Sequence, residues 1–351
     1  MSVDVEFLQE LTRAPGPTGF EGPVRDVVRR RLAAVATPES DPLGNVWARV
    51  VGAGGLEVVA VAHADQIGLI VTYVDDAGFV WFDRIGGVDR QVLPGHTVTI
   101  HAAPGPVEGV VGRRPSHFIP ADERGKAPEF HEQYIDIGAR SRAAALERIA
   151  VGDPVTFHQR FVELSADTYA TLACDDRAGV YVVSRALEDY APSTARSSLT
   201  ALATVHEETT FMGARSRSLR TRPDVVVVVD GDFATDQPDV DVKKAGGEVR
   251  LGGGPVLMRG TGSNERLFQR ACEAARRRDL PFQVKAAGGR MSTDADELMA
   301  AGCVTLSLGI PMRYMHAPFE VLRGDDLEAA VTLIVGLVHD LDDADDRTFC
   351  R

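Results

Sequence analysis

The chain has 351 residues, 44% of them hydrophobic, and a formal net charge of -13 at pH 7. This size allows a large buried core and predicts one large domain or a domain with an insert. The acidic charge argues against a nucleic-acid partner, because such partners require a basic surface. No apolar segment approaches the roughly twenty residues of a membrane span, and the first residues do not read as a signal peptide. The sequence therefore predicts a cytoplasmic protein with no membrane partner.

Four cysteines are scattered along the chain without a CxxC spacing. This distribution is typical of reduced thiols rather than of a disulfide framework. The cysteines are Cys174, Cys272, Cys303 and Cys350.

The N-terminal part alternates between helical and extended patterns. Apolar residues recur at helical spacing within residues 7–11 and 24–32, on either side of a Pro/Gly turn. Two apolar runs follow, at residues 46–51 and 57–62, and the second leads into His63. Two amphipathic helices and two strands are predicted here.

The character of the chain changes between residues 68 and 162. Short apolar runs separated by Asp, Gly and Pro turns are typical of β-strands, and only residues 142–148 have a helical pattern. The segment 68–162 is therefore predicted to be an inserted β-rich domain, with a small β-barrel as its expected form. Residues 1–67 and 163–351 are predicted to form the other domain.

An α/β rhythm resumes after the insert and predicts a doubly wound, mostly parallel sheet. The predicted elements are a helix at 177–190, a strand ending at 205, a helix at 213–219, a strand at 225–229, a helix at 264–278, a helix at 294–301, a strand at 304–310 and a helix at 325–341.

Several of the predicted strands run directly into acidic residues or histidines. Five consecutive valines end at Asp230, and another buried run ends before Glu207 and Glu208. Ligands of open parallel sheets bind at the carboxyl ends of the strands, and His, Asp and Glu are ligands for zinc-like ions. The residues predicted at this edge are His63, Asp65, Glu207, Glu208, Asp230 and His316.

Each of these residues alone also has a structural interpretation. A lone histidine at a strand end is usually structural, and adjacent glutamates are common in solvated loops. Asp175 and Asp176 could cap the helix that follows them. Asp65, two positions after His63, could instead hold the second imidazole nitrogen of that histidine. The structural interpretations leave the coincidence of so many strand ends unexplained.

Six short motifs in order resemble those of the glutamyl, deblocking and tetrahedral metalloaminopeptidases, and the resemblance covers nearly the whole chain. The motifs lie at 63–68 (HADQIG), 175–179 (DDRAG), 207–208 (EE), 229–230 (VD), 292–295 (STDA) and 313–318 (RYMHAP). Any one of them is unspecific, whereas six in order are specific.

The resemblance implies a hydrolase that removes N-terminal residues from peptides and uses two divalent ions per subunit, zinc or cobalt with manganese as a further candidate. It implies His63 and Asp230 as ligands of one ion, Glu208 and His316 as ligands of the other, and Asp175 as a bridge. Glu207 is implied as the general base acting on a metal-bridging water. Asp65 is grouped with Glu207 as a catalytic residue. Members of the family form homo-oligomers, commonly tetrahedral dodecamers, through the β-barrel insert.

The chain departs from the family pattern at Gln66, His206 and Thr209-Thr210, and Asp232 could compete with Asp230 as a ligand. Two other functions stay open: a dinuclear amidohydrolase or deacylase acting on a blocked amino acid, and a catalytically silent peptide-binding homologue. Four arginines could bind substrate carboxylates or surface acids, namely Arg177, Arg259, Arg290 and Arg313.

Overall fold

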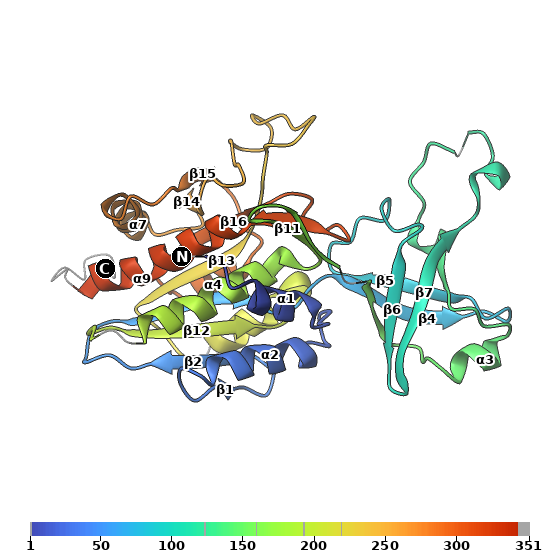
Figure 1. The fold of residues 1–351 in the computed structure, drawn as a ribbon, viewed down its shortest axis with the longest axis horizontal. Coiled ribbons are helices and arrows are strands. Elements are labelled where there is room, and N and C mark those ends of the chain that lie inside the picture. The colour runs from blue at the N-terminus through green and yellow to red at the C-terminus, as the bar shows by residue number, and fades with distance from the viewer. Residues whose placement is uncertain (1, 123, 159, 192–193, 219, 343–351) are drawn as a thin grey trace.

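The computed structural model describes residues 2–122, 124–158, 160–191, 194–218 and 220–342. It has two parts, a sheet domain and a closed β-barrel that projects from one end of it (Figure 1). Cys350 lies outside the described residues, and the thiols of Cys174, Cys272 and Cys303 are free. None of the described helices combines the length and the apolar character needed to cross a membrane.

The sheet domain is built around an eight-stranded mixed sheet within the described residues. In spatial order its strands are β1 (Glu39–Ser40), β2 (Val46–Val50), β12 (Ser198–Thr204), β3 (Glu57–His63), β13 (Val225–Phe233), β16 (Thr305–Met312), β14 (Val256–Gly260) and β15 (Gln283–Ala287). The pairs β12–β3, β3–β13, β13–β16 and β14–β15 are parallel, and the other pairs are antiparallel. The predicted α/β class and mostly parallel sheet are confirmed.

Helices cover both faces of this sheet. One face carries α1 (Val5–Arg13), α2 (Gly22–Leu32), α4 (Cys174–Tyr190), α7 (Glu265–Arg277) and α9 (Gly324–Asp342), and the other carries α6 (Met212–Ser218) and α8 (Asp294–Ala300). Residues of the valine strand β13 alternate between the two cores, because successive side chains of a strand point to opposite faces. Val227 and Val229 lie in the larger core, whereas Val226 and Val228 lie in the smaller one.

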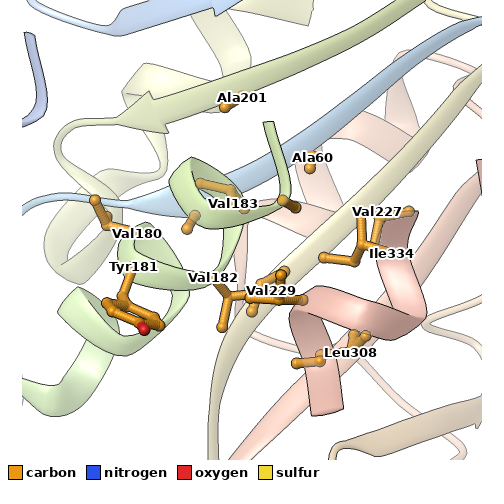
Figure 2. Packing of buried hydrophobic residues seen from close by; sticks show 14 of the residues in the cluster. Ala60, Val180, Tyr181, Val182, Val183, Ala201, Val227, Val229, Leu308 and Ile334 are labelled. Carbon is orange, nitrogen blue, oxygen red and sulfur yellow. The ribbon is translucent and has the colours of Figure 1, made fainter. Parts of the chain in front are cut away.

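The larger core joins the central strands to α4 and α9. Val182 of α4, Val229 of β13 and Ile334 of α9 belong to this one buried cluster, as Figure 2 shows. Burying a valine or isoleucine side chain contributes roughly 1.5–3 kcal/mol. This packing fixes the central strands, whose carboxyl ends carry the polar residues described below.

The inserted segment forms a closed barrel with a separate core. Its strands, in order around the barrel, are β4 (Gly68–Val74), β5 (Val80–Ile85), β8 (Gln133–Asp136), β7 (Gly105–Arg113), β6 (Thr97–Ala102) and β9 (Pro154–Phe157). The helix α3 (Arg142–Leu146) lies in the same segment, where a helix was predicted. Closure pairs the edge strands with each other, so the barrel leaves no open sheet edge. The predicted inserted β-barrel is confirmed.

Two details differ from the sequence-based expectation. The valine strand does not end at Asp230, since its ladder with β16 continues through Asp230↔Gly309 to Phe233↔Met312. A separate three-stranded sheet was also not anticipated, made of β10 (Phe161–Ser165), β11 (Thr168–Thr171) and β17 (Glu320–Arg323). Its strands are short. β10 and β11 form a local hairpin, whereas β17 pairs with β11 from a distant part of the chain, which no local pattern marks.

Candidate metal centre

Elements from across the sheet domain bring the predicted ligands to one cavity of about 460 Å³. His63 is the last residue of β3, and Asp230 lies in the neighbouring parallel strand β13. Their ladder pairs Val61 with Val228, so the same register continued by two residues sets His63 beside Asp230. The cavity is lined by His63, Asp175, Glu207, Glu208, Asp230 and His316, together with the residues of its wall.

The first turns of two helices supply the remaining carboxylates. Asp175 lies in the first turn of α4, where its backbone is not helical. Glu207 and Glu208 begin the four-residue helix α5 (Glu207–Thr210), which follows β12. Both helices begin beside the crevice at the carboxyl ends of the parallel strands, where ligands of such sheets bind.

Asp175 occupies the centre of the cluster. Its Oδ1 lies 3.2 Å from Nε2 of His63, and its Oδ2 lies 3.2 Å from Nε2 of His316. The His63 Nε2 atom also lies 3.7 Å from Asp230 Oδ1 and 3.8 Å from Glu207 Oε2. Each oxygen of one carboxylate therefore faces a different imidazole.

The second imidazole has its own carboxylate partner. Nε2 of His316 lies 3.5 Å from Glu208 Oε2, and the histidine belongs to the loop between β16 and β17. Two adjoining groups of ligand atoms result, one around each histidine, and Asp175 contributes to both.

Three compact groups of ligand atoms within the described residues could each hold a metal ion, with all atoms of a group within 4.8 Å of one another. His316 belongs to none of these compact groups and approaches the cluster through Asp175 and Glu208. Asp232, the possible competitor of Asp230, also lies outside them. The groups are His63 with Glu207 and Asp230, His63 with Asp175 and Glu208, and Asp175 with Asp176 and Asp230.

The electrostatics of the cluster fit a divalent cation. Burial and neighbouring carboxylates raise the pKa of Glu207 to about 11, and the same two causes raise the pKa of Glu208 well above its usual range. The hydrogen bond with Asp175 raises the pKa of His316 to about 9. Glu208 Oε1 is buried without a hydrogen-bond partner in the described structure. Buried carboxylates that hold protons this tightly are short of positive charge, which a metal ion bound by imidazole and carboxylate would supply.

Asp65 holds the turn that carries the two glutamates. Its Oδ1 accepts the N–H of Glu207 at 3.0 Å, and its Oδ2 accepts the N–H of Glu208 at 3.1 Å and the hydroxyl of Thr18 at 2.7 Å. The predicted contact with His63 is made differently. Nδ1 of His63 lies 3.2 Å from the backbone carbonyl of Asp65 and 3.6 Å from its carboxylate. The carbonyl holds the imidazole, and the carboxylate holds the glutamates.

Comparison with known proteins identifies the family of this chain. The M42 glutamyl aminopeptidase family profile matches residues 44–333. The chain belongs to this family. It is 32% identical over 345 residues to a lysyl aminopeptidase of Pyrococcus furiosus, with 97% of this chain and 98% of the relative covered.

Solved structures of M42 relatives have the same two-part fold. A TET aminopeptidase from the marine sediment archaeon Thaumarchaeota archaeon SCGC AB-539-E09 superposes with a TM-score of 0.91 at 30% identity, with 96% of each chain covered. The Pyrococcus horikoshii TET1 peptidase, which assembles into a tetrahedron or a large octahedral shell, gives a TM-score of 0.85 at 29% identity, with 95% of this chain and 98% of that chain covered. The matched family and these relatives are peptidases, and the family is one of aminopeptidases.

Sequence reasoning missed Glu320 in this member of the M42 family. Its buried carboxylate accepts the N–H of Asp175 through Oε2 and the N–H of His316 through Oε1, both at 3.0 Å. Glu320 thus fixes the backbones of Asp175 and His316. It belongs to the short strand β17, which no strand-end pattern indicated.

Asp176 and the arginines have structural roles. Asp176 accepts the N–H of Gly179 at 2.9 Å, so it is the aspartate that caps α4. Arg177 is fully buried and donates to Gln66 Oε1 at 3.0 Å, so one family departure lies beside a buried guanidinium group. The other three arginines pair with acids outside the cavity lining: Arg259 with Glu265, Arg290 with Asp296 and Arg313 with Asp236.

Proposed function

We propose that the protein is a metal-dependent aminopeptidase that binds two divalent ions and removes N-terminal residues from peptides. The observation that carries this proposal is the position of Asp175, whose two carboxylate oxygens face His63 and His316 at 3.2 Å each. A carboxylate placed between two imidazoles is the arrangement that a bridging ligand of a two-ion site requires.

The ligand assignment follows from the contacts around each histidine. His63 and Asp230, 3.7 Å apart, would hold one ion, and His316 and Glu208, 3.5 Å apart, would hold the other. Asp175 would contribute to both. Imidazole and carboxylate ligands accept zinc, cobalt or manganese, so these three metals are the candidates. When bound, such ions lower the pKa of water and polarise a carbonyl group.

Glu207 is the residue we assign as general base. It lines the cavity beside His63, with its Oε2 3.8 Å from the imidazole. Its carboxylate would take a proton from the attacking water and deliver it to the leaving amine nitrogen. Because burial and like charges raise the pKa of Glu207 to about 11, this role requires added positive charge in the cluster. The base and the cation site therefore depend on each other.

The barrel is proposed to serve assembly. We assign residues 68–162 to an assembly domain and residues 1–67 with 163–351 to the catalytic domain. The assembly of the Pyrococcus horikoshii relative into closed shells supports a homo-oligomer for this chain, with a dodecamer as the expected form. Light scattering coupled to size-exclusion chromatography would measure the subunit number, and a monomer at micromolar concentration would contradict the assignment.

The test of the proposed activity uses metal-stripped protein and a panel of aminoacyl p-nitroanilides. Release of p-nitroaniline should be absent without metal and should return with zinc, cobalt or manganese. The same side chains with an acetylated amino group serve as the control, because an aminopeptidase requires the free amine. Hydrolysis of the acetylated substrates alone would identify the deacylase alternative. No hydrolysis of either set, by folded protein that binds metal, would identify the silent homologue.

A further inference from the structure

One ion pair lies in the wall of the cavity and takes no part in the proposed metal centre. Asp232 Oδ1 accepts a hydrogen bond from Nζ of Lys285, and both residues line the cavity together with the cluster residues. The side chains are only 5% and 15% exposed, respectively. Among the described residues that line the cavity, Lys285 is the sole lysine or arginine.

The ion pair lies close to the proposed metal centre. Asp230 and Asp232 are two positions apart in β13, which places their side chains on the same face of the strand and their Cα atoms about 6.6 Å apart. Gly309 of the neighbouring strand makes room here, since a Cβ at that position would come within 2.8 Å of the Asp232 Cβ. Asp232 and Lys285 therefore lie within reach of the first side chain of a substrate whose N-terminal amine is at the metal centre.

Apart from the cluster residues and this ion pair, the cavity wall is mainly apolar, with Thr209, Ser292, Thr293 and Ser307 as its hydroxyl residues. Its side chains include three methionines and two phenylalanines, namely Met258, Met291, Met315, Phe211 and Phe233. Methionine is unbranched and polarizable, so it adapts to apolar groups of different shape. Such a wall gains contact area from an apolar side chain, and outside the cluster and the Asp232–Lys285 pair it offers no opposite charge to a charged one.

From this placement we infer that the Asp232–Lys285 pair determines specificity by making the far end of the cavity electrically neutral, so that the enzyme selects uncharged N-terminal side chains such as Leu, Met and Phe. This inference rests on the proposed aminopeptidase function. A lysine side chain of the substrate would meet the ammonium group of Lys285, and a glutamate side chain would meet the carboxylate of Asp232.

The energetic reason is the cost of an unpaired charge in a poorly hydrated site. A charged substrate side chain must either stay unpaired beside the ion pair or separate it, and breaking a buried pair is strongly unfavourable. An apolar side chain requires neither. The second oxygen of Asp232 is buried without a hydrogen-bond partner in the described structure, so Lys285 is the group that balances its charge.

The test measures kcat/KM for leucyl, lysyl and glutamyl p-nitroanilides with wild-type protein and three variants. Lys285→Met should leave Asp232 unpaired and raise the lysyl-to-leucyl ratio by roughly tenfold or more. Asp232→Asn should leave Lys285 unpaired and raise the glutamyl-to-leucyl ratio by a similar factor. The double variant carries no charge and should return the preference to leucine, and it also covers the case in which a single variant fails to fold.

An exposed pair on the same domain provides the matched controls. Lys244 and Asp241 form an ion pair with side chains 87% and 51% exposed, and neither lines the cavity. Lys244→Met and Asp241→Asn should leave all three ratios unchanged. Circular dichroism and elemental analysis would establish that each variant is folded and binds metal as the wild type does.

The outcomes separate this inference from the proposed function. Wild-type hydrolysis of leucyl substrate, with ratios that stay the same in every folded Asp232 and Lys285 variant, would overturn the specificity assignment alone. Wild-type preference for lysyl or glutamyl substrate would overturn it as well. No hydrolysis of any free-amine substrate with any of the metals would overturn both proposals.

Discussion

The carboxylate of Asp65 accepts the backbone N–H of Glu207 at 3.0 Å and thereby connects the end of one strand to the start of the helical turn that carries the proposed base. The same carboxylate accepts the N–H of Glu208 and the hydroxyl of Thr18. An ionised carboxylate that receives three hydrogen bonds is held firmly, and charge-assisted bonds of this kind are the stronger ones. Asp65 therefore positions the base and one proposed ligand without touching a substrate.

Replacing Asp65 by asparagine tests this positioning role. An asparagine amide has one accepting oxygen in place of two, so at least one of the three hydrogen bonds should be lost. The turn that carries Glu207 should then be held less firmly. We expect kcat to fall by about 10- to 100-fold. Asp76→Asn, at an exposed position in the barrel, is the matched control and should leave kcat unchanged. Wild-type kcat in Asp65→Asn would show that the turn does not depend on this carboxylate.

Glu207→Gln separates proton transfer from metal binding. Glutamine keeps the shape of the side chain but cannot accept a proton from water. Bound metal should stay near the wild-type amount by elemental analysis, whereas turnover of a good substrate should fall by roughly 10²- to 10⁴-fold. Glu163→Gln on the exposed strand β10 serves as the control. Near wild-type turnover in Glu207→Gln would mean that another group is the base.

The contacts of His316 predict a change in metal stoichiometry. Its imidazole faces Asp175 and Glu208, and the described cavity lining contains no histidine besides His63 and His316. His316→Ala should therefore lower the bound metal from two ions to about one per subunit. His117→Ala, at an exposed position, should bind as the wild type does. Two tightly bound ions in His316→Ala would exclude the histidine from the metal centre.

The architecture follows from local patterns to a large extent. The valine strand, the amphipathic helices and the β-rich insert each have a periodicity that the structure retains. The strands β14, β11 and β17 were not anticipated. β14 lies antiparallel to its neighbour β16, and β11 and β17 pair residues that are about 150 positions apart. Such pairings depend on the tertiary fold, which a short sequence window does not contain.

The site divides in a similar way. His63 and Asp230 are found by strand ends, because parallel strands bring their carboxyl ends to one edge. Glu320 carries no such signal, and the sequence indicated Asp232 only as a possible competitor of Asp230, without its partner Lys285. Glu320 becomes important through two backbone N–H groups from other elements, and Asp232 through a lysine on β15. Residues that act through long-range partners are recognised only once the fold has brought those partners together.

The last prediction concerns stability and uses a carboxylate far from the proposed ligands. Asp326, in the first turn of α9, accepts the N–H of Gly252 at 2.8 Å and that of Gly254 at 2.7 Å. Burial nevertheless raises the pKa of Asp326 to about 6, above the ordinary aspartate value of 3.8. The folded state therefore binds this proton more tightly than the unfolded state does. The stabilisation is complete below the unfolded pKa and is lost as the pH rises through about 6.

Between about pH 7.5 and about pH 5, protonation of Asp326 should add roughly 1.4 kcal/mol to the free energy of unfolding. Asp326→Asn lacks this titration. Between the same two pH values, its free energy of unfolding should therefore rise by roughly 1.4 kcal/mol less than that of the wild type. Urea unfolding at the two pH values, with both proteins stripped of metal, measures the difference. Asp26→Asn on the exposed face of α2 should follow the wild type. Parallel pH profiles for wild type and Asp326→Asn would show that Asp326 is already ionised in the folded protein at about pH 5, because the two N–H groups outweigh its burial.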